Sequence, residues 1–492
     1  MQLFRRKAIT ELVSEDTNSL RRVLNAGDLI MLAIGAVIGA GIFGAIGTAA
    51  AGQIGPDGQI VRYGAGPGLV FSFLLLGGSC ALAALCYAEL ASMIPQAGSA
   101  YSYSYATLGE LVAWIIGWDL ILEYAVGNVA VAISWSDYFT TVISGLGVDL
   151  PLWLTTGYRT ALLSFDPGVK ELIHTAPKIF GIPLLVNLPA FGIVMAITWL
   201  LLRGVKESVR ANNIMVIVKL IALALFIGVG ITHLQPANLT PFMPNGFLGV
   251  HQGAAIVFFA YIGFDAISTA AEETRNPQRN LPIGILGGLA VCTFIYILVG
   301  FVLTGIVPYT ELAVADPLSH ALAVSGFQSV GWVVALGAGV SMTAVLLVFQ
   351  YGQPRIFFAM ARDGLLPGWA ARIHPTRRIP YVTTLVTGVL VAVGALLGDA
   401  AETYDLTNIG TLFAFAVVCV GVLVLRVVEP DRPRPFRVPF VWPVALSGVA
   451  TCIFIMLGLP TQAWVRFGWW LGAGLLIYLS YGIRHSRLKN LG

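Results

Sequence analysis

The residues with the clearest chemical pattern lie in the stretch IGAVIGAGIFGAIG, residues 34–47. Within it, residues 39–44 match the G-x-G-x-x-G pattern of dinucleotide-binding loops. Asp57 follows at roughly the distance at which such a loop places its ribose-binding carboxylate. The pattern alone leaves two possibilities, a cofactor loop or glycines that serve the backbone of a helix.

Motifs for catalysis or metal binding are missing from the sequence. The five cysteines lie in apolar stretches without a C-x-x-C pair, and neither H-E-x-x-H nor G-x-S-x-G occurs. We therefore expect no metal site, no bound cofactor and no enzymatic activity. The remaining candidates are ionisable residues inside apolar stretches, namely Asp119, Glu123, Lys219 and Asp265.

Composition decides the class of protein. Hydrophobic residues make up 57% of the 492 residues and charged residues only 11%, whereas about a quarter of the residues of a soluble domain are charged. Asp316 and Arg355 enclose 38 residues without a formal charge, and a membrane-spanning helix needs about 20 apolar residues. The chain is therefore predicted to be an all-α polytopic membrane protein whose main surroundings are the lipid bilayer, with no nucleic-acid partner.

The apolar windows predict twelve transmembrane helices in a single membrane domain, residues 1–492. The expected helices are 28–50, 67–94, 110–142, 184–202, 211–233, 249–271, 283–307, 328–360, 381–398, 405–426, 439–459 and 466–484. With the N-terminus inside, 22 of the 28 Lys and Arg residues fall on the cytoplasmic side and five on the other side. We therefore expect a multi-pass protein of the cell membrane with cytoplasmic N- and C-termini.

The glycine-rich stretch lies inside the first of these helices, which argues against a nucleotide site. G-x-G-x-x-G binds nucleotides only between a strand and a helix, and no sheet-forming half is expected here. Gly35 and Gly39 could instead form a G-x-x-x-G packing face. Alternatively, the five glycines of residues 35–47 could interrupt the helix, as in secondary transporters that bind substrate at broken helices.

A second segment favours the interrupted helix. Five helices later, residues 256–269 read IVFFAYIGFDAIST, with Gly263 and the ionisable Asp265 inside the membrane. Transporters built from inverted repeats interrupt the first helix of each half. The sixth helix is where a repeat of five helices would place the second interruption.

The chain resembles the amino acid–polyamine–organocation (APC) superfamily, and within it the bacterial type of the cationic amino acid transporter group. The resemblance rests on GAVIGAGIFG, FFAYIGFDAIS, CYAELASMIPQAGSAYSYSYATLGE, AEETRNPQRNLPIGI, QPRIFFAMARDGLLP, GWDLILEYAVG and RPFRVP. It implies a LeuT-like five-plus-five inverted repeat with discontinuous helices 1 and 6. The implied parts are a cytoplasmic segment 1–27, repeats 28–233 and 249–426, two further helices in 439–484 and a tail 485–492.

The resemblance also implies that the broken helices bind the substrate through their backbone. The N–H groups of Ala40 and Gly41 would receive a carboxylate, with Gly39 supplying flexibility. The α-ammonium would be met by the carbonyl groups of Val37, Ile38, Phe259, Ala260 and Ile262. In relatives, the aromatic ring at the position of Phe259 closes over the substrate.

Three acidic residues have open roles. Glu123 lies 13 residues after Glu110, about 20 Å into its helix, where it could face a cationic substrate or organise the pocket through hydrogen bonds. Asp119, one turn shallower, is expected to pair or to snorkel. Asp265, next to Gly263, is expected to satisfy freed backbone groups, so Asp119, Gly263 and Asp265 are structural or gating candidates.

Lys219 lies nine residues after Arg210, about 13 Å into the membrane. In proton-coupled relatives a lysine at this position replaces the cation that sodium-coupled relatives bind between helices 1 and 8. The resemblance thus implies proton coupling through Lys219. The alternative is a lysine that snorkels to the cytoplasmic face.

The expected function is proton-coupled symport of L-amino acids by alternating access, with H⁺ as the coupling ion. Two alternatives stay open, an amino acid exchanger on the same scaffold and a sensor that binds amino acids without transport. The substrate class, cationic or small neutral, also stays open. A small single-span accessory subunit is compatible with the sequence as a further partner.

Overall fold

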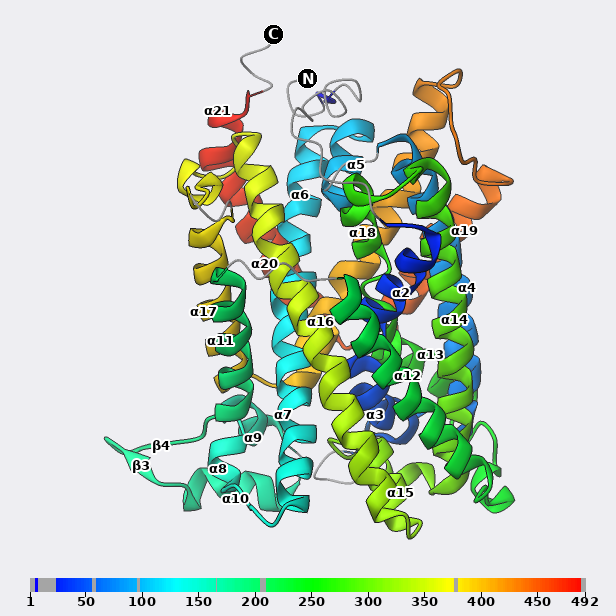
Figure 1. Cartoon of the computed structure of the whole chain (residues 1–492), viewed down its shortest axis with the longest axis vertical. Helices are drawn as coiled ribbons and strands as arrows, with labels where there is room; N and C mark the ends of the chain where they lie inside the picture. The colour runs from blue at the N-terminus through cyan, green and yellow to red at the C-terminus, as the bar shows by residue number, and fades with distance from the viewer. Residues whose placement is uncertain are drawn as a thin grey trace.

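The computed structural model describes residues 5–7, 24–54, 59–94, 98–164, 166–203, 209–375 and 379–487. Asp57, most of the predicted segment 1–27 and the last residues of the predicted tail lie outside these ranges. The described chain is a bundle of long helices that run side by side along the longest axis of the molecule (Figure 1). Short helices and two small hairpins lie mainly at the ends of the bundle.

Each of the twelve predicted ranges contains helix. The unbroken long helices are α4 (Leu69–Met93), α12 (Val209–Ile231), α14 (Pro277–Ile306), α16 (Gln328–Arg362) and α18 (Ala400–Val428). The third predicted range is α6 (Glu110–Ile121), η4 (Leu122–Val126) and α7 (Gly127–Gly145). Shorter helices are α11 (Leu188–Leu202), α17 (Tyr381–Leu397), α19 (Val441–Met456) and α20 (Thr461–Ile477).

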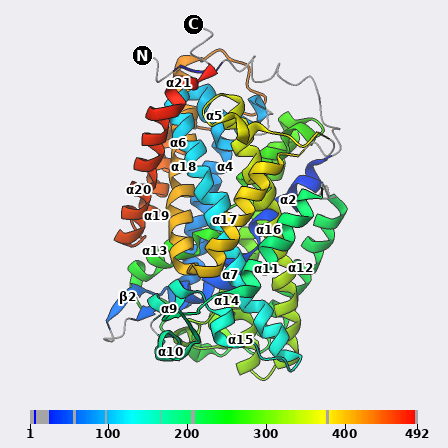
Figure 2. The ribbon, with the colours of Figure 1, turned by 90° about the vertical axis from the view of Figure 1, so that its left-hand side faces the viewer.

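The first and sixth predicted helices are divided into segments. The first comprises α2 (Ala26–Val37), η2 (Gly41–Ala45) and α3 (Ile46–Ala51). The sixth comprises α13 (Gly246–Val257), η6 (Phe258–Tyr261) and η7 (Asp265–Glu273). Much of each of these helices is buried, whereas α19 and α20 lie along one edge of the bundle (Figure 2).

By length and composition, seven described helices could cross a membrane, or up to nine if each bent pair counts as one span. The chain is therefore a multi-pass membrane protein. Two predicted spans, α11 and α17, are apolar but only 15 and 17 residues long, shorter than the usual span of about 20 residues. The α19–α20 pair bends by 115°.

Several short elements were not predicted. Helix α5 (Ser99–Thr107) is buried along its whole length and packs against α6 and α18. Strands β1 (Gly52–Ile54) and β2 (Ile60–Tyr63) form an antiparallel hairpin directly after the first broken helix. This hairpin carries Arg62, which forms an ion pair with Asp405 of α18 at 3.0 Å.

The described ends of the chain meet at one residue after α16. Asp363 accepts a hydrogen bond from Lys7 Nζ at 3.1 Å and from the hydroxyl of Tyr101 at 2.7 Å. The backbone carbonyl of Asp363 also accepts from the N–H of Arg487 at 3.1 Å. The N- and C-terminal segments therefore lie at the same end of the bundle.

A buried charge cluster fixes the loop between α18 and α19. Glu89 of α4 receives two hydrogen bonds from Arg426, at 3.0 and 2.7 Å, and one from the backbone of Val438 at 2.7 Å. Arg434 also pairs with Glu89 at 3.3 Å, and their side chains are 0% and 1% exposed. The loop is thus attached to the helices beneath it.

We expect Glu89→Ala to lower the free energy of unfolding by about 3–5 kcal/mol, because it leaves buried arginine charge without its partner. Thermal unfolding in detergent measures the effect as a lower Tm. The matched control is Glu429→Ala, which removes the half-exposed pair with Arg432 in the same loop and should cost about 1 kcal/mol or less. Equal Tm values for the two variants would contradict a stabilising role for the cluster.

Candidate functional site

The first broken helix is interrupted where the glycines predicted it. Helix α2 ends at Val37, and Ile38 is extended, with φ −76° and ψ 104°. The chain becomes helical again with a π-helical turn that begins at Gly41. The two halves meet at an angle of 48°. At this helix start the N–H groups of Ile42 and Phe43 both donate to the Gly39 carbonyl at 3.2 Å, which leaves the N–H groups of Ala40 and Gly41 at the interruption itself.

The second interruption lies at Ile262–Phe264. Ile262 is extended, with φ −66° and ψ 136°. Gly263 has φ +111°, a conformation that other residues rarely adopt. The chain then continues as the 3₁₀-helix η7 from Asp265. Gly263 thus redirects the backbone between η6 and η7.

The two interruptions touch each other. A Cβ atom on Gly41 would lie 2.3 Å from the Cα and 2.4 Å from the N atom of Ala260. A Cβ atom on Gly263 would lie 3.0 Å from the carbonyl oxygen of Ala36. Any side chain at residue 41 would therefore push the two broken helices apart.

Lys219 of α12 lies at the first interruption. Its Nζ donates to the carbonyl oxygens of Gly35 and Ile38, each at 2.8 Å, and the residue is 0% exposed. The alternative in which Lys219 snorkels to the membrane surface is therefore wrong. The ammonium group instead satisfies carbonyls at the end of α2.

The Ile38 carbonyl also accepts from Ser341 Oγ of α16 at 2.8 Å. A carbonyl oxygen has two lone pairs, and Lys219 and Ser341 occupy both of those on Ile38. This arrangement differs from the expectation that Ile38 offers its carbonyl to a substrate, because no lone pair remains for a third donor.

Tyr296 of α14 connects the two interruptions. Its hydroxyl lies 3.1 Å from the carbonyl oxygen of Val37 and 2.8 Å from that of Ala260, and it can donate to either. Sequence reasoning missed Tyr296. The available signal was a tyrosine in the apolar run CTFIYILVG, because a buried tyrosine hydroxyl usually has a hydrogen-bond partner.

Phe259, 4% exposed, lies on one side of the interruptions. Its ring packs edge-on against Tyr404 of α18, with ring centroids 4.6 Å apart. The Tyr404 hydroxyl is 2.5 Å from Ser134 Oγ of α7. These three side chains connect η6 with α18 and α7, so that an aromatic layer covers this side of the site. The carbonyl of Phe259 accepts from the Ile262 N–H at 3.3 Å.

Glu123 faces the second broken helix. It lies in the π-helical turn η4, a local distortion that is frequent at functional sites, and it is 2% exposed. Its carboxyl group lies beside that of Asp265, and its Oε1 has no hydrogen-bond partner among the described residues. Two carboxyl groups that share a buried site repel each other unless one of them carries a proton. This neighbour favours a role for Glu123 in organising the pocket over direct contact with a cationic substrate.

Asp265 also accepts a hydrogen bond from Ser99 Oγ at 3.2 Å, which ties η7 to α5. Asp119 is different, because it is 1% exposed and its Oδ1 has no hydrogen-bond partner among the described residues. It therefore does not snorkel. No described residue forms an ion pair with it, so the expected pairing is also wrong for the described part of the chain.

The arrangement places donors and acceptors side by side. The N–H groups of Ala40 and Gly41 lie between α2 and η2, and the carbonyls of Val37 and Ala260 each keep one lone pair beside Tyr296. Helix-start amides favour anions such as carboxylates, and carbonyls favour ammonium groups. Within the described ranges, no cluster of three or more His, Cys, Asp or Glu side chains could hold a metal ion. The site suits a small zwitterion.

Tyr296→Phe removes the hydroxyl shared by the two interruptions. We expect amide hydrogen exchange in residues 35–43 to become about tenfold faster, because an unmade buried hydrogen bond costs about 1–3 kcal/mol. Hydrogen–deuterium exchange followed by mass spectrometry measures this change. The control Tyr478→Phe removes a hydroxyl that bonds with Glu110 far from the site. Unchanged exchange at residues 35–43 in Tyr296→Phe would contradict the bridging role.

Comparison with known proteins agrees with this geometry. The amino acid permease family model matches residues 24–474. The methylthioribose transporter of Bacillus subtilis is 45% identical over 488 residues, with 99% of each chain covered. The branched-chain amino acid permease BcaP of the same organism is 46% identical over 490 residues, again with 99% of each chain covered. The vacuolar cationic amino acid transporter 4 of Arabidopsis thaliana is 38% identical over 441 residues, which cover 87% of this chain and 68% of the relative. The chain belongs to the amino acid permease family of the APC superfamily.

Proposed function

We propose that this protein is a secondary active transporter that carries L-amino acids together with protons by alternating access. The observation that carries the proposal is the contact of Lys219 with the Gly35 and Ile38 carbonyls at the end of α2. A fully buried lysine is rare in a membrane and usually functional. Here its ammonium group stabilises the backbone that the interruption exposes.

The coupling step follows from the chemistry of that contact. The Lys219 ammonium lies between α2 and α16, since Ser341 of α16 donates to the same Ile38 carbonyl. In sodium-coupled relatives of this fold, a cation binds between these two helices. Deprotonation would replace a charged donor by a neutral amine and weaken the hold on α2. Proton binding and release at Lys219 would then favour different positions of the broken helix.

The proposed architecture has twelve spans, with residues 28–233 and 249–426 as inverted five-helix repeats. Interruptions in the first helix of each repeat support this assignment. We place the chain in the cell membrane with both termini in the cytoplasm. The distribution of Lys and Arg supports that orientation, and the contacts of Lys7 and Arg487 with Asp363 keep both ends on one side.

For the substrate, we propose a neutral L-amino acid with an apolar side chain. The side chains beside the interruptions include Phe259, Val345 and Phe349, which are apolar. Glu123, the acid that could attract a cationic side chain, lies beside the carboxyl group of Asp265. The name of the relative BcaP, a branched-chain amino acid permease, agrees with this class.

Uptake into proteoliposomes tests the coupling. We expect an inward proton gradient to drive accumulation of labelled leucine by the wild type. Under the same gradient, Lys219→Met should accumulate at least about tenfold less leucine than the wild type. The control Lys178→Met changes an exposed lysine of the hairpin β3 (Lys178–Ile179) and β4 (Ile182–Pro183), and it should transport like the wild type.

Three outcomes would reject the coupling proposal. Full gradient-driven uptake by Lys219→Met would remove Lys219 from the mechanism. Counterflow of leucine without net uptake in the wild type would favour an exchanger, and binding without any flux would favour a sensor.

Substrate competition tests the amino acid class. We expect unlabelled leucine, but not arginine, to inhibit uptake at equal concentration. Glu123→Gln should bind leucine with unchanged affinity, because an amide can donate a hydrogen bond to the neighbouring carboxyl group of Asp265. Arginine uptake that is comparable to leucine uptake and is lost in Glu123→Gln would instead place Glu123 against a cationic substrate.

A further inference from the structure

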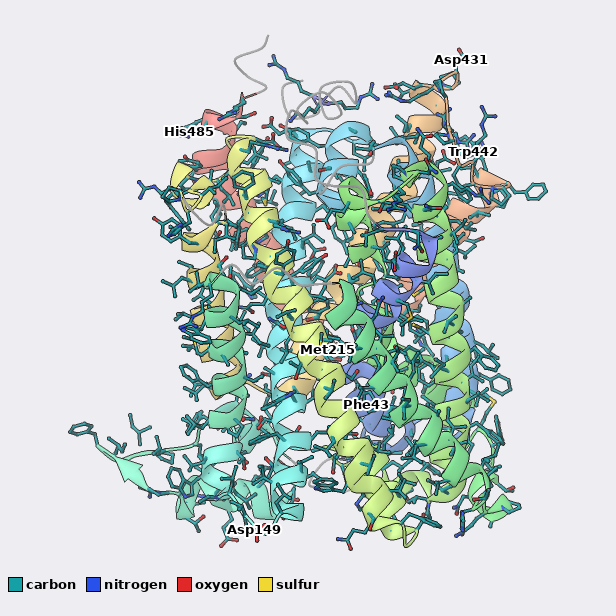
Figure 3. The ribbon with its side chains drawn as sticks, in the orientation of Figure 1. Phe43, Asp149, Met215, Asp431, Trp442 and His485 are labelled. Atoms are coloured by element: carbon teal, nitrogen blue, oxygen red, sulfur yellow. The ribbon has the colours of Figure 1, made fainter. Side chains whose placement is uncertain are left out.

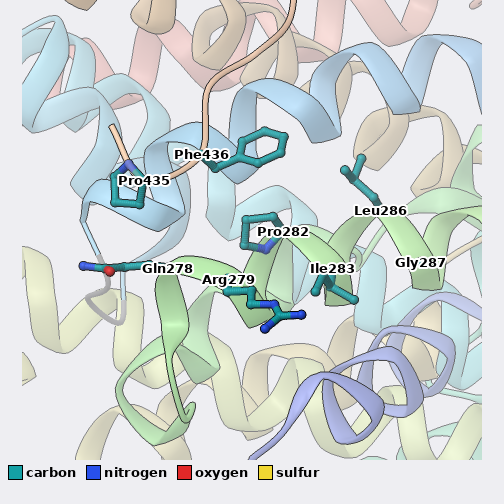
Figure 4. Close-up of a pocket in the computed structure, with 8 residues that line it drawn as sticks. All are labelled: Gln278, Arg279, Pro282, Ile283, Leu286, Gly287, Pro435 and Phe436. Carbon is teal, nitrogen blue, oxygen red and sulfur yellow. The ribbon is translucent and has the colours of Figure 1, made fainter. Parts of the chain in front are cut away.

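A groove on the outer surface of α14 is separate from the two interruptions (Figure 4). Its first part has a volume of about 650 Å³ and lies between α14 and the loop after α18. Gln278 and Arg279 form its polar end. The remaining wall is mostly apolar and includes Pro282, Ile283 and Phe436. The groove thus has one charged end and one apolar end.

A second cavity of about 310 Å³ continues the groove along α14. The two cavities share Leu286, and the second runs between α14 and α4, past Ala290 and Phe294 to Gly77. Arg279 and Phe294 are 15 residues apart on one helix, which corresponds to about 22 Å. Ile283 and Phe294 are 40% and 64% exposed on the outside of the bundle, where a membrane protein meets lipid.

The loop that covers the polar end is held in place before anything binds. The Arg434 guanidinium donates to the backbone carbonyls of Leu425, Glu429, Pro430 and Arg432. The N–H of Phe436 donates to Ser92 Oγ at 3.3 Å. Pro435 and Phe436 are therefore fixed against α4, and a ligand would lose little free energy in ordering the groove.

The polar end lies at the expected level of the lipid headgroups. Phe440 and Trp442, just beyond the same loop, are 84% and 52% exposed, and exposed aromatic residues mark the membrane interface. Trp442 lies on the outside of the bundle, towards the end that carries His485 (Figure 3). Arg279 is exposed and forms no ion pair with another described residue, so its charge is available to an anion.

We propose that this groove binds an anionic phospholipid, with the phosphate at Arg279 and one acyl chain along Ile283, Leu286 and Phe294. Thr293, a polar residue of the second cavity, already donates its hydroxyl to the Leu289 carbonyl at 2.9 Å, so the deeper wall offers an acyl chain few polar groups. A cationic end and an apolar channel of about 22 Å match the chemistry and the length of one lipid leaflet. Helix α14 also packs against α2, and a Cβ atom on Gly287 of the groove would lie 3.0 Å from the side chain of Ile30, so this lipid lies beside the first broken helix.

Native mass spectrometry of the purified full chain tests the proposal with phosphatidylglycerol and phosphatidylcholine of identical acyl chains. We expect the wild type to retain phosphatidylglycerol about fivefold more than phosphatidylcholine, since one arginine near the membrane surface contributes about 1 kcal/mol. Arg279→Gln should abolish this preference. Ala290→Phe, which fills the exposed second cavity, should reduce retention of both lipids.

The matched controls are Arg484→Gln and Ala473→Phe, which change an exposed arginine and an exposed alanine on α21 (Ile483–His485) and α20. Both should retain lipid like the wild type. Equal retention of the two lipids by the wild type, or an unchanged preference in Arg279→Gln, would overturn the proposal. A single-span polypeptide that co-purifies and crosslinks at residue 290 would also overturn it, because a protein would then occupy the groove. None of these readouts depends on transport, so they stand apart from the test of function.

Discussion

The structure depends on one constraint, namely that backbone groups released by a broken helix inside a bilayer must find hydrogen-bond partners within the protein. Four other helices contribute such partners. Lys219 comes from α12, Tyr296 from α14 and Ser341 from α16, and Asn408 of α18 donates to the Ala255 carbonyl at 2.9 Å. The interruptions are therefore the centre around which the bundle is arranged.

These contacts couple the two broken helices to each other. Gly41 packs on the backbone of Ala260, and Tyr296 contacts a carbonyl from each helix. The neighbouring carboxyl groups of Glu123 and Asp265 bring η4 and η7 together. A movement of α2 must therefore change contacts made by α12, α14 and α16 together, which is how a small chemical change at one side chain can reach several helices.

Uncharged windows were sufficient to locate the long helices of the bundle, because burial in lipid excludes charge over about 20 residues, but they did not predict short helices such as α5. The glycines located the first interruption. The predicted depth of Lys219 and Glu123 in the membrane identified them as ionisable residues at an unusual place. Tyr296, Ser341 and Asn408 escaped notice because neutral polar residues are common in such helices, and their roles arise only from the packing of distant segments. For the same reason, the sequence could not reveal that Ile38 already accepts two hydrogen bonds or that Asp119 lacks a partner.

The contacts of Asp363 have a consequence for the order of assembly during synthesis. Lys7 precedes its partner in the ion pair by 356 positions. At about 5–20 residues per second, synthesis of the stretch between them takes roughly 20–70 s. The backbone of residues 5–7 bonds to Tyr105 and Glu110, which are made long before Asp363. This end of the molecule is thus assembled in two stages, first by backbone contacts with α5 and α6 and later by the ion pair after α16.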